Sequence, residues 1–299
     1  VNFAADVTFA DGADIITASA GTSNTRVGVN TGNSIASGGN YNVLVGDEAG
    51  TALTTGDNNV AIGFEALKTE DANGDNVAVG YQALKTLNAG ADGFNVAVGY
   101  LAGTAMTTGK ENSILGAFAG DNLTQGINNV AMGTGALGAD TLGHSSVAIG
   151  YTALFTQNFT TATDSFNTAV GHQAGKAVTT GLRNTLIGGQ AGDALTTSNN
   201  SVAVGYNALH ANTVSAGNVA VGKDALKAFN VGSGSGNNTA VGTLAGGALT
   251  SGVNNTLMGS LAGDGLTDAD LNVAIGKGAL GADTLGSQSV AIGFAALEA

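Results

Sequence analysis

Two kinds of short motif in this chain could in principle bind a ligand. GTGALG at 133–138 and GKGALG at 276–281 match the glycine spacing of a dinucleotide loop. Such a loop opens a long helix and is followed by an acidic residue about twenty positions on, whereas here ADTLG follows at once. DADLN at 268–272 resembles the opening of a calcium loop, but Val273 replaces the required glycine and Ala279 the bidentate glutamate. We therefore predict no cofactor and no metal site from these motifs.

Groups that could perform catalysis are scattered. His144, His172 and His210 fall at different places in the sequence pattern described below, so they suggest neither a metal cluster nor a catalytic triad. A polysaccharide-cleaving enzyme would need paired carboxylates, whereas the carboxylates of this chain are dispersed. We predict no catalytic residue and no enzymatic activity.

Aromatic residues are the best candidates for contact with a partner. Phe64, Tyr81 and Tyr100 follow one another at nearly constant spacing, which predicts a short aromatic track. The track is interpreted either as structural stacking or as a surface on which a glycan stacks. Further phenylalanines lie in longer insertions and are candidates for the same role: Phe94, Phe155, Phe159, Phe166 and Phe229.

All these residues are set in a repeat. A nine-residue phrase reads NVLVGDEAG at 42–50, NVAIGFEAL at 59–67, NVAVGYQAL at 76–84 and SVAIGFAAL at 289–297. A fixed short period indicates one structural unit stacked on copies of itself. With the first glycine of the phrase as position zero, the copies are centred on Gly28, Gly46, Gly63, Gly80, Gly99, Gly116, Gly133, Gly150, Gly171, Gly188, Gly205, Gly222, Gly242, Gly259, Gly276 and Gly293.

The pattern within each copy, or rung, is that of a strand. Positions −3 and −1 are mostly β-branched or otherwise apolar and are two residues apart, so they share one face; we expect this pair, as in Val60 and Ile62, to fill the core. The small residue at −2, usually alanine, would then point outward. Glycine ends the strand, and a second short strand is expected before a Gly/Asn turn near +10. Helical rungs are disfavoured because the apolar spacing is two rather than 3.6.

Position −4 is asparagine in most rungs. Stacked in register, these amides would form a ladder of hydrogen bonds along the axis. The predicted ladder comprises Asn42, Asn59, Asn76, Asn95, Asn112, Asn129, Asn167, Asn184, Asn218, Asn238, Asn255 and Asn272.

The rungs also repeat at a higher level. Rungs with leucine at +4 alternate in pairs with rungs that have glycine at +4 and an apolar residue at +7, so the chain repeats about every 71 residues, from Gly46 to Gly116 and Gly188. Once per cycle the step lengthens, with the extra residues at 88–94, 155–166 and 229–237. We expect these insertions to form a row of bulges on one face.

Composition narrows the class of protein. Glycine makes up 49 of 299 residues and hydrophobic residues 43%, with no proline and no cysteine, which is too apolar for a disordered linker. The formal net charge is −13, so nucleic acid is a poor partner. No apolar run is long enough to span a bilayer, and no membrane insertion is expected.

The phrase Asn/Ser-Val-Ala-Ile/Val-Gly resembles the head repeats of trimeric autotransporter adhesins, the YadA-like family. NTAVGHQAG at 167–175 is similar to repeats of phage tail fibres. The resemblance covers residues 21–299 and implies a left-handed parallel β-roll, three copies of which associate side by side. The rung here is longer than in the family.

The fold expected is all-β: a parallel β-solenoid of about 16 rungs of about 17 residues, with an N-terminal entry segment at 1–20 and the solenoid at 21–299. The function expected is a non-enzymatic extracellular fibre or adhesin segment, from a bacterial surface or a phage tail fibre, that associates with itself and meets a host glycan or protein. The alternative is a structural subunit of a head-to-tail filament. An ice-binding rod fits less well, because its threonine pairs skip rungs.

Overall fold

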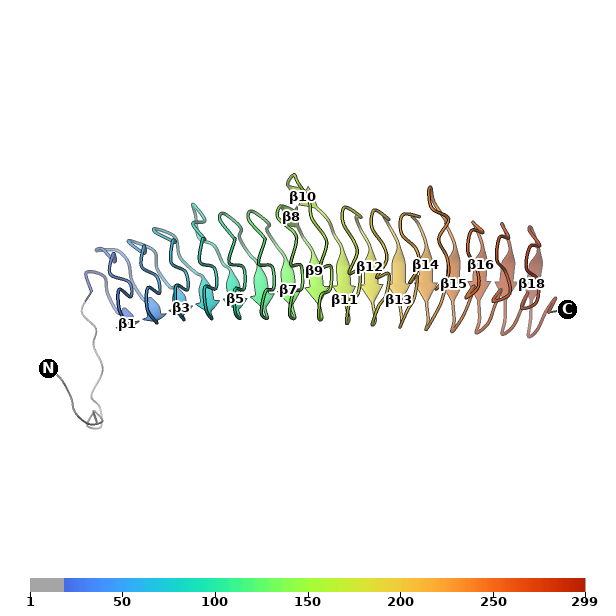
Figure 1. Cartoon of the computed structure of the whole chain (residues 1–299), viewed down its shortest axis with the longest axis horizontal. Helices are drawn as coiled ribbons and strands as arrows, with labels where there is room; N and C mark the ends of the chain where they lie inside the picture. The colour runs from blue at the N-terminus through green and yellow to red at the C-terminus, as the bar shows by residue number, and fades with distance from the viewer. Residues whose placement is uncertain (1–18, 299) are drawn as a thin grey trace, which may run out of the picture.

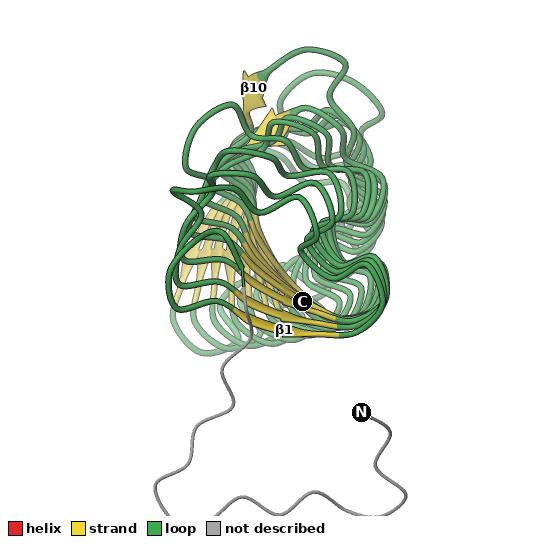
Figure 2. Ribbon diagram, turned by 90° about the vertical axis from the view of Figure 1, so that its left-hand side faces the viewer, coloured by secondary structure: helices red, strands yellow, loops and turns green. Residues whose placement is uncertain are grey.

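The computed structural model describes residues 19–298, and within them the chain is a parallel β-solenoid of about 16 turns with no helix (Figure 1). Viewed along the long axis, the strands stack on one side and turns make up the rest of each coil (Figure 2). The predicted all-β parallel solenoid of about 16 rungs is thus confirmed. The predicted entry segment at 1–20 lies outside the described residues except for its last two.

One three-residue strand from each rung enters a single sheet. The strands are β1 Thr25–Val27, β2 Val43–Val45, β3 Val60–Ile62, β4 Val77–Val79, β5 Val96–Val98, β6 Ser113–Leu115, β7 Val130–Met132, β9 Val147–Ile149, β11 Thr168–Val170, β12 Thr185–Ile187, β13 Val202–Val204, β14 Val219–Val221, β15 Thr239–Val241, β16 Thr256–Met258, β17 Val273–Ile275 and β18 Val290–Ile292. Neighbours pair in parallel, like position with like position, as Val60 with Val77. The repeat therefore sets the register directly.

The prediction of a second strand in each rung is wrong for the described residues. After the glycine the backbone turns tightly, because positions +2 and +4 both adopt left-handed φ, as in Gln82 at 55° and Leu84 at 48°. An extended strand cannot continue through such residues. Beyond the main sheet, residues 19–298 contain the two-residue strands β8 Gly143–His144 and β10 Thr163–Asp164, which pair with each other, and two isolated bridges.

The orientation expected for the strand residues is also wrong. Ala61 at −2 is completely buried, whereas Val60 is half-buried and Ile62 at −1 is 38% exposed. The prediction that −3 and −1 share one face is correct. The prediction that this face points into the core, which was based on hydrophobicity, is wrong. The interior is narrow and must also hold the leucines from the turns, so the small residue faces inward and the valine and isoleucine face outward.

Most rungs fill the interior in one of two ways. In one, alanine at −2 leaves room for leucine at +4, as with Ala203 and Leu209. In the other, +4 is glycine and the apolar residue lies at +7; four such rungs also carry a large residue at −2, namely Leu44, Ile114, Leu186 and Leu257. A Cβ on Gly192 would lie 2.7 Å from Leu195 Cδ1 and 2.8 Å from Leu186 Cδ2. Glycine at +4 is therefore required by the leucines around it.

The asparagines at −4 lie buried in a row, and most of them make two kinds of contact; Asn76 and Asn218 donate instead to carbonyls of the preceding turn. The Oδ1 of Asn42 accepts the backbone N–H of Asn59 in the next rung at 2.8 Å, and its Nδ2 donates to the carbonyl of Gly56 in its own rung, also at 2.8 Å. The same pattern recurs along the rod, as at Asn129 and Asn255. One amide thus closes its own coil and ties it to the next.

In the rung where Ser201 replaces asparagine, another amide supplies the missing donor. Ser201 cannot reach the turn carbonyl of its rung, and Asn212, at +7 of that rung, donates to the carbonyl of Ser215 at 2.7 Å. Ser215 holds the position that Gly56 holds in the rung of Asn42. The buried carbonyl of Ser215 is thus satisfied by a different residue.

A second ladder, which the sequence analysis missed, runs along position +8. The hydroxyl of Thr107 donates to the carbonyl of Thr124 at 3.1 Å, and that of Thr124 to the carbonyl of Thr141 at 3.0 Å. Thr179, Thr196, Thr250 and Thr267 make the same contact with the next rung.

The three insertions rise from one edge of the rod, as expected from their phase (Figure 1).

Replacing Gly192 with alanine tests the packing of the core. The variant adds an overlap with two leucines to the strain of a left-handed residue (φ 54°), so we expect roughly 2–5 kcal/mol of destabilisation. Gly278→Ala is the matched control, because its φ is 68° but nothing lies within 4 Å of the added Cβ; it should lose only about 1–2 kcal/mol. Equal losses in urea unfolding would contradict this view of the interior.

Replacing Asn129 with alanine tests the ladder. The change leaves the N–H of Ser146 and the carbonyl of Gly143 without their partner, at roughly 1–3 kcal/mol for each buried group. Amide hydrogen exchange should accelerate first in the rungs next to residue 129, since each rung depends on its neighbours. Asn88→Ala, at an exposed asparagine, should change neither stability nor exchange; a similar effect there would argue against a special role for the row.

Candidate binding surface

The histidines and carboxylates do not come together. Among residues 19–298 no group of three or more His, Asp or Glu side chains could hold a metal ion. His144 accepts a hydrogen bond from the backbone N–H of Ile127 at 3.0 Å, and His172 stacks on Tyr151 at 5.4 Å. His210 lies 2.5 Å from a carboxylate oxygen of Asp193.

The aromatic track is present and extends one ring further than the sequence analysis placed it. Phe64 and Tyr81 stack with centroids 5.5 Å apart, and Tyr81 and Tyr100 with centroids 5.1 Å apart. Phe118 then meets Tyr100 edge to face at 5.3 Å. Phe118 was missed because it lies at +2 rather than +1 of its rung, where a left-handed φ of 56° brings its ring onto the same surface. All four rings are partly exposed to solvent.

The phenylalanines of the insertions divide into two groups. Phe94, Phe155 and Phe166 are exposed and remain candidates for contact with a partner. Phe159 and Phe229, which are 5% and 0% exposed, are buried, so their assignment as contact residues is wrong. Phe229 occupies the +7 core position that leucine fills in other rungs, and residue counting alone could not tell a core phenylalanine from a loop one.

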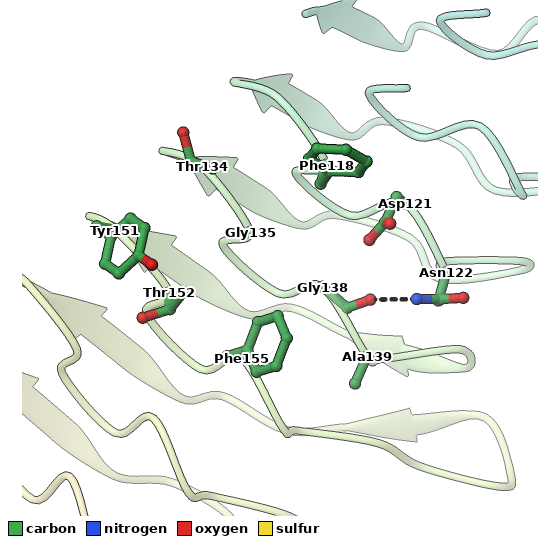
Figure 3. Close-up of a pocket in the computed structure, with 10 residues that line it drawn as sticks. All are labelled: Phe118, Asp121, Asn122, Thr134, Gly135, Gly138, Ala139, Tyr151, Thr152 and Phe155. Carbon is green, nitrogen blue, oxygen red and sulfur yellow. Dashed lines mark hydrogen bonds between the residues drawn. The ribbon is translucent and has the colours of Figure 1, made fainter. Parts of the chain in front are cut away.

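A pocket of about 410 Å³ opens where the aromatic track ends. It spans three successive rungs, and Phe118, Tyr151 and Phe155 form its aromatic walls (Figure 3). Its floor is the middle rung, in which Gly135 and Gly138 carry no side chains. The GTGALG motif, which failed as a nucleotide loop, thus provides the space for the pocket.

Two polar groups at this pocket have little intramolecular compensation. Burial raises the pKa of Asp121, and the only group that opposes this shift is its own backbone N–H. The hydroxyl oxygen of Thr152 is buried without a hydrogen-bond partner. Asn122 instead donates to the carbonyl of Gly138 at 2.5 Å, which fixes the amide at the rim (Figure 3).

A second candidate surface is the outward face of the sheet. Position −1 is apolar in every rung from β1 to β18: Val27, Val45, Ile62, Val79, Val98, Leu115, Met132, Ile149, Val170, Ile187, Val204, Val221, Val241, Met258, Ile275 and Ile292. Position −3 holds only valine, threonine or serine. With strands about 4.8 Å apart, this uncharged strip runs roughly 70–75 Å. We call it the β-branched strip.

The chain matches no protein-family model, no curated protein and no solved structure. Among the described residues there is no helix that could cross a membrane.

Proposed function

We propose that this chain is a non-enzymatic segment of an extracellular fibre or adhesin, in which copies associate side by side through the β-branched strip. The observation that carries the proposal is the strip itself. A chain with a net charge of −13 places no charged side chain at positions −3 and −1 of any of its sixteen sheet strands. Contiguous exposed apolar surface of this length is characteristic of interfaces.

A second copy is the partner that fits the strip best. The residues of the strip repeat at the spacing between rungs, and the strip runs the length of the rod. A partner must therefore present apolar groups with the same period over the same distance. Another copy of this chain does so. The resemblance of the repeat phrase to YadA-like heads favours three left-handed coils around a common axis, with the strips facing one another.

The bonds between rungs make the rod rigid, which suits it to the proposed role in a fibre. Every rung is bonded to the next through the sheet, and many also through the asparagine row or the threonine row. Such a rod holds its outer surface at a fixed distance from whatever carries it. The surface away from the strip, with the aromatic track and the insertions, is then available to a glycan or protein on a cell.

Sedimentation equilibrium of the wild-type chain and of Leu115→Asp/Ile187→Asp tests the association. Both side chains are already exposed in the single chain, at 48% and 40%, so the substitutions leave the core intact. We expect a trimer for the wild type and a monomer with unchanged circular dichroism for the variant, since each buried leucine or isoleucine is worth roughly 1.5–3 kcal/mol.

Thr160→Asp/Ala162→Asp, in the exposed insertion, adds the same two charges away from the strip and should remain trimeric. A wild-type chain that stays monomeric at high concentration would overturn side-by-side association. Polymers of unequal length would instead support the head-to-tail filament.

A further inference from the structure

The pocket lies at a place that recurs once in each 71-residue cycle, and the four copies can be compared. The place is bounded by position +5 of one rung, positions +2 and +5 of the next, and positions +1 and +5 of the third. The pocket around Gly135 and Gly138 is the second copy. The residues at the equivalent positions of the other three copies show which side chains this pocket lacks.

In the first copy ion pairs occupy the place. Lys68 binds Glu65 at 2.6 Å and also contacts Glu48, and Lys85 binds Glu65 at 2.7 Å. Hydrogen bonds from Lys68 and Lys85 lower the pKa of Glu65 to about 2. Here every charged group has an intramolecular partner.

In the third copy a histidine occupies the place. Asp193 corresponds to Asp121, and His210, which corresponds to Gly138, lies 2.5 Å from its carboxylate. Asn207 stands where the pocket has Gly135. The fourth copy repeats the two glycines as Gly278 and Gly281 but has Leu261 and Glu298 at the positions of Phe118 and Phe155, so the aromatic walls are incomplete.

In the second copy, therefore, the carboxylate of Asp121 is present, its intramolecular partner is replaced by glycine, and three aromatic rings surround the space that remains. The volume of about 410 Å³ lies within the range of small-ligand sites, roughly 300–1,000 Å³. Asp121 is half-buried; a carboxylate that has lost part of its hydration without gaining a partner is unfavourable, and an external donor would relieve that cost.

We propose that this pocket binds one neutral or amino-sugar residue of a glycan, with the pyranose ring stacked on the aromatic walls and its hydroxyl or amino groups bonded to Asp121. The proposal rests on the proposed function, since it names the ligand class of the surface that the fibre presents.

The chemistry of the walls and of the polar groups favours a sugar. A pyranose has an apolar face of C–H groups that packs on an aromatic ring, and hydroxyls at its edge that need donors and acceptors. Phe118, Tyr151 and Phe155 supply the rings, and Asp121 supplies an acceptor. The carboxylate and the net charge of −13 disfavour acidic sugars.

The aromatic track extends the site along the rod. Its rings follow the pocket without a gap, through Phe118 to Tyr100, Tyr81 and Phe64, with centroids 5.1–5.5 Å apart. This spacing is comparable to the length of one sugar residue in an extended chain. A linear oligosaccharide with one residue in the pocket would place its next residues over these rings.

The deciding variant is Gly135→Asn/Gly138→His, which installs the residues that the chain itself uses at the equivalent positions Asn207 and His210. It fills the pocket and gives Asp121 an imidazole partner, and the fold should survive because the third copy already accommodates it. The matched control is Gly278→Asn/Gly281→His in the fourth copy. Phe155→Ala removes one wall independently.

Binding is measured by saturation-transfer NMR and calorimetry with four tetrasaccharide probes: β-1,4-linked glucose, N-acetylglucosamine, glucosamine and galacturonate. We expect at least one of the first three to bind, galacturonate to bind more weakly, and affinity to fall at least tenfold in Gly135→Asn/Gly138→His and in Phe155→Ala. The control should bind as the wild type does.

Binding of none of the four probes, or binding that the filled pocket leaves unchanged, would overturn the proposal. The same titrations are run on the Leu115→Asp/Ile187→Asp variant, whose substitutions lie on the β-branched strip. The variant should bind as the wild type does. Sugar binding by a wild-type chain that sediments as a monomer would support the pocket while contradicting side-by-side association, and a wild-type trimer that binds no probe would do the reverse.

Discussion

The structure depends on a buried amide that must bond in two directions at once. Most asparagines at −4 donate to a carbonyl within their own coil and accept the N–H of the next, as Asn129 does with Gly143 and Ser146. Both bonds lie out of water, where an unpaired backbone group is costly. A slip of one residue between rungs would break the acceptor contact and turn every side chain to the other face of the sheet. The register of the solenoid follows from this constraint.

The period of the sequence was sufficient to predict the parallel solenoid and the number of its turns. It was not sufficient to predict which face of the strand is inside. Val60 and Ile62 are more hydrophobic than Ala61, yet Ala61 is the buried residue, because the interior had to accommodate leucines from the turns as well. The expected second strand failed for a related reason: left-handed residues such as Leu84 place those leucines inside the coil at the expense of extended backbone.

The candidate site was predictable only in part. Equal spacing placed Phe64, Tyr81 and Tyr100 on one track, but Phe118 lies one position later in its rung and joins them through backbone geometry. Phe159 and Phe229 look like loop residues in the sequence and are buried in the structure. The pocket itself arises from side chains that are missing, at Gly135 and Gly138, between rings from neighbouring rungs. Such a space becomes visible only when the rungs are stacked.

The most direct measurement of in-register stacking uses the absence of cysteine from the chain. Val202 and Val219 are direct partners in adjacent strands, whereas Val221 lies two residues along from that partner. Disulfides form only when the Cα atoms are about 4.4–6.8 Å apart, so Val202→Cys/Val219→Cys should oxidise readily within one chain and Val202→Cys/Val221→Cys should not. Equal oxidation of both pairs, or of neither, would contradict the stacking of like residues on which the fold, the β-branched strip and the pocket depend.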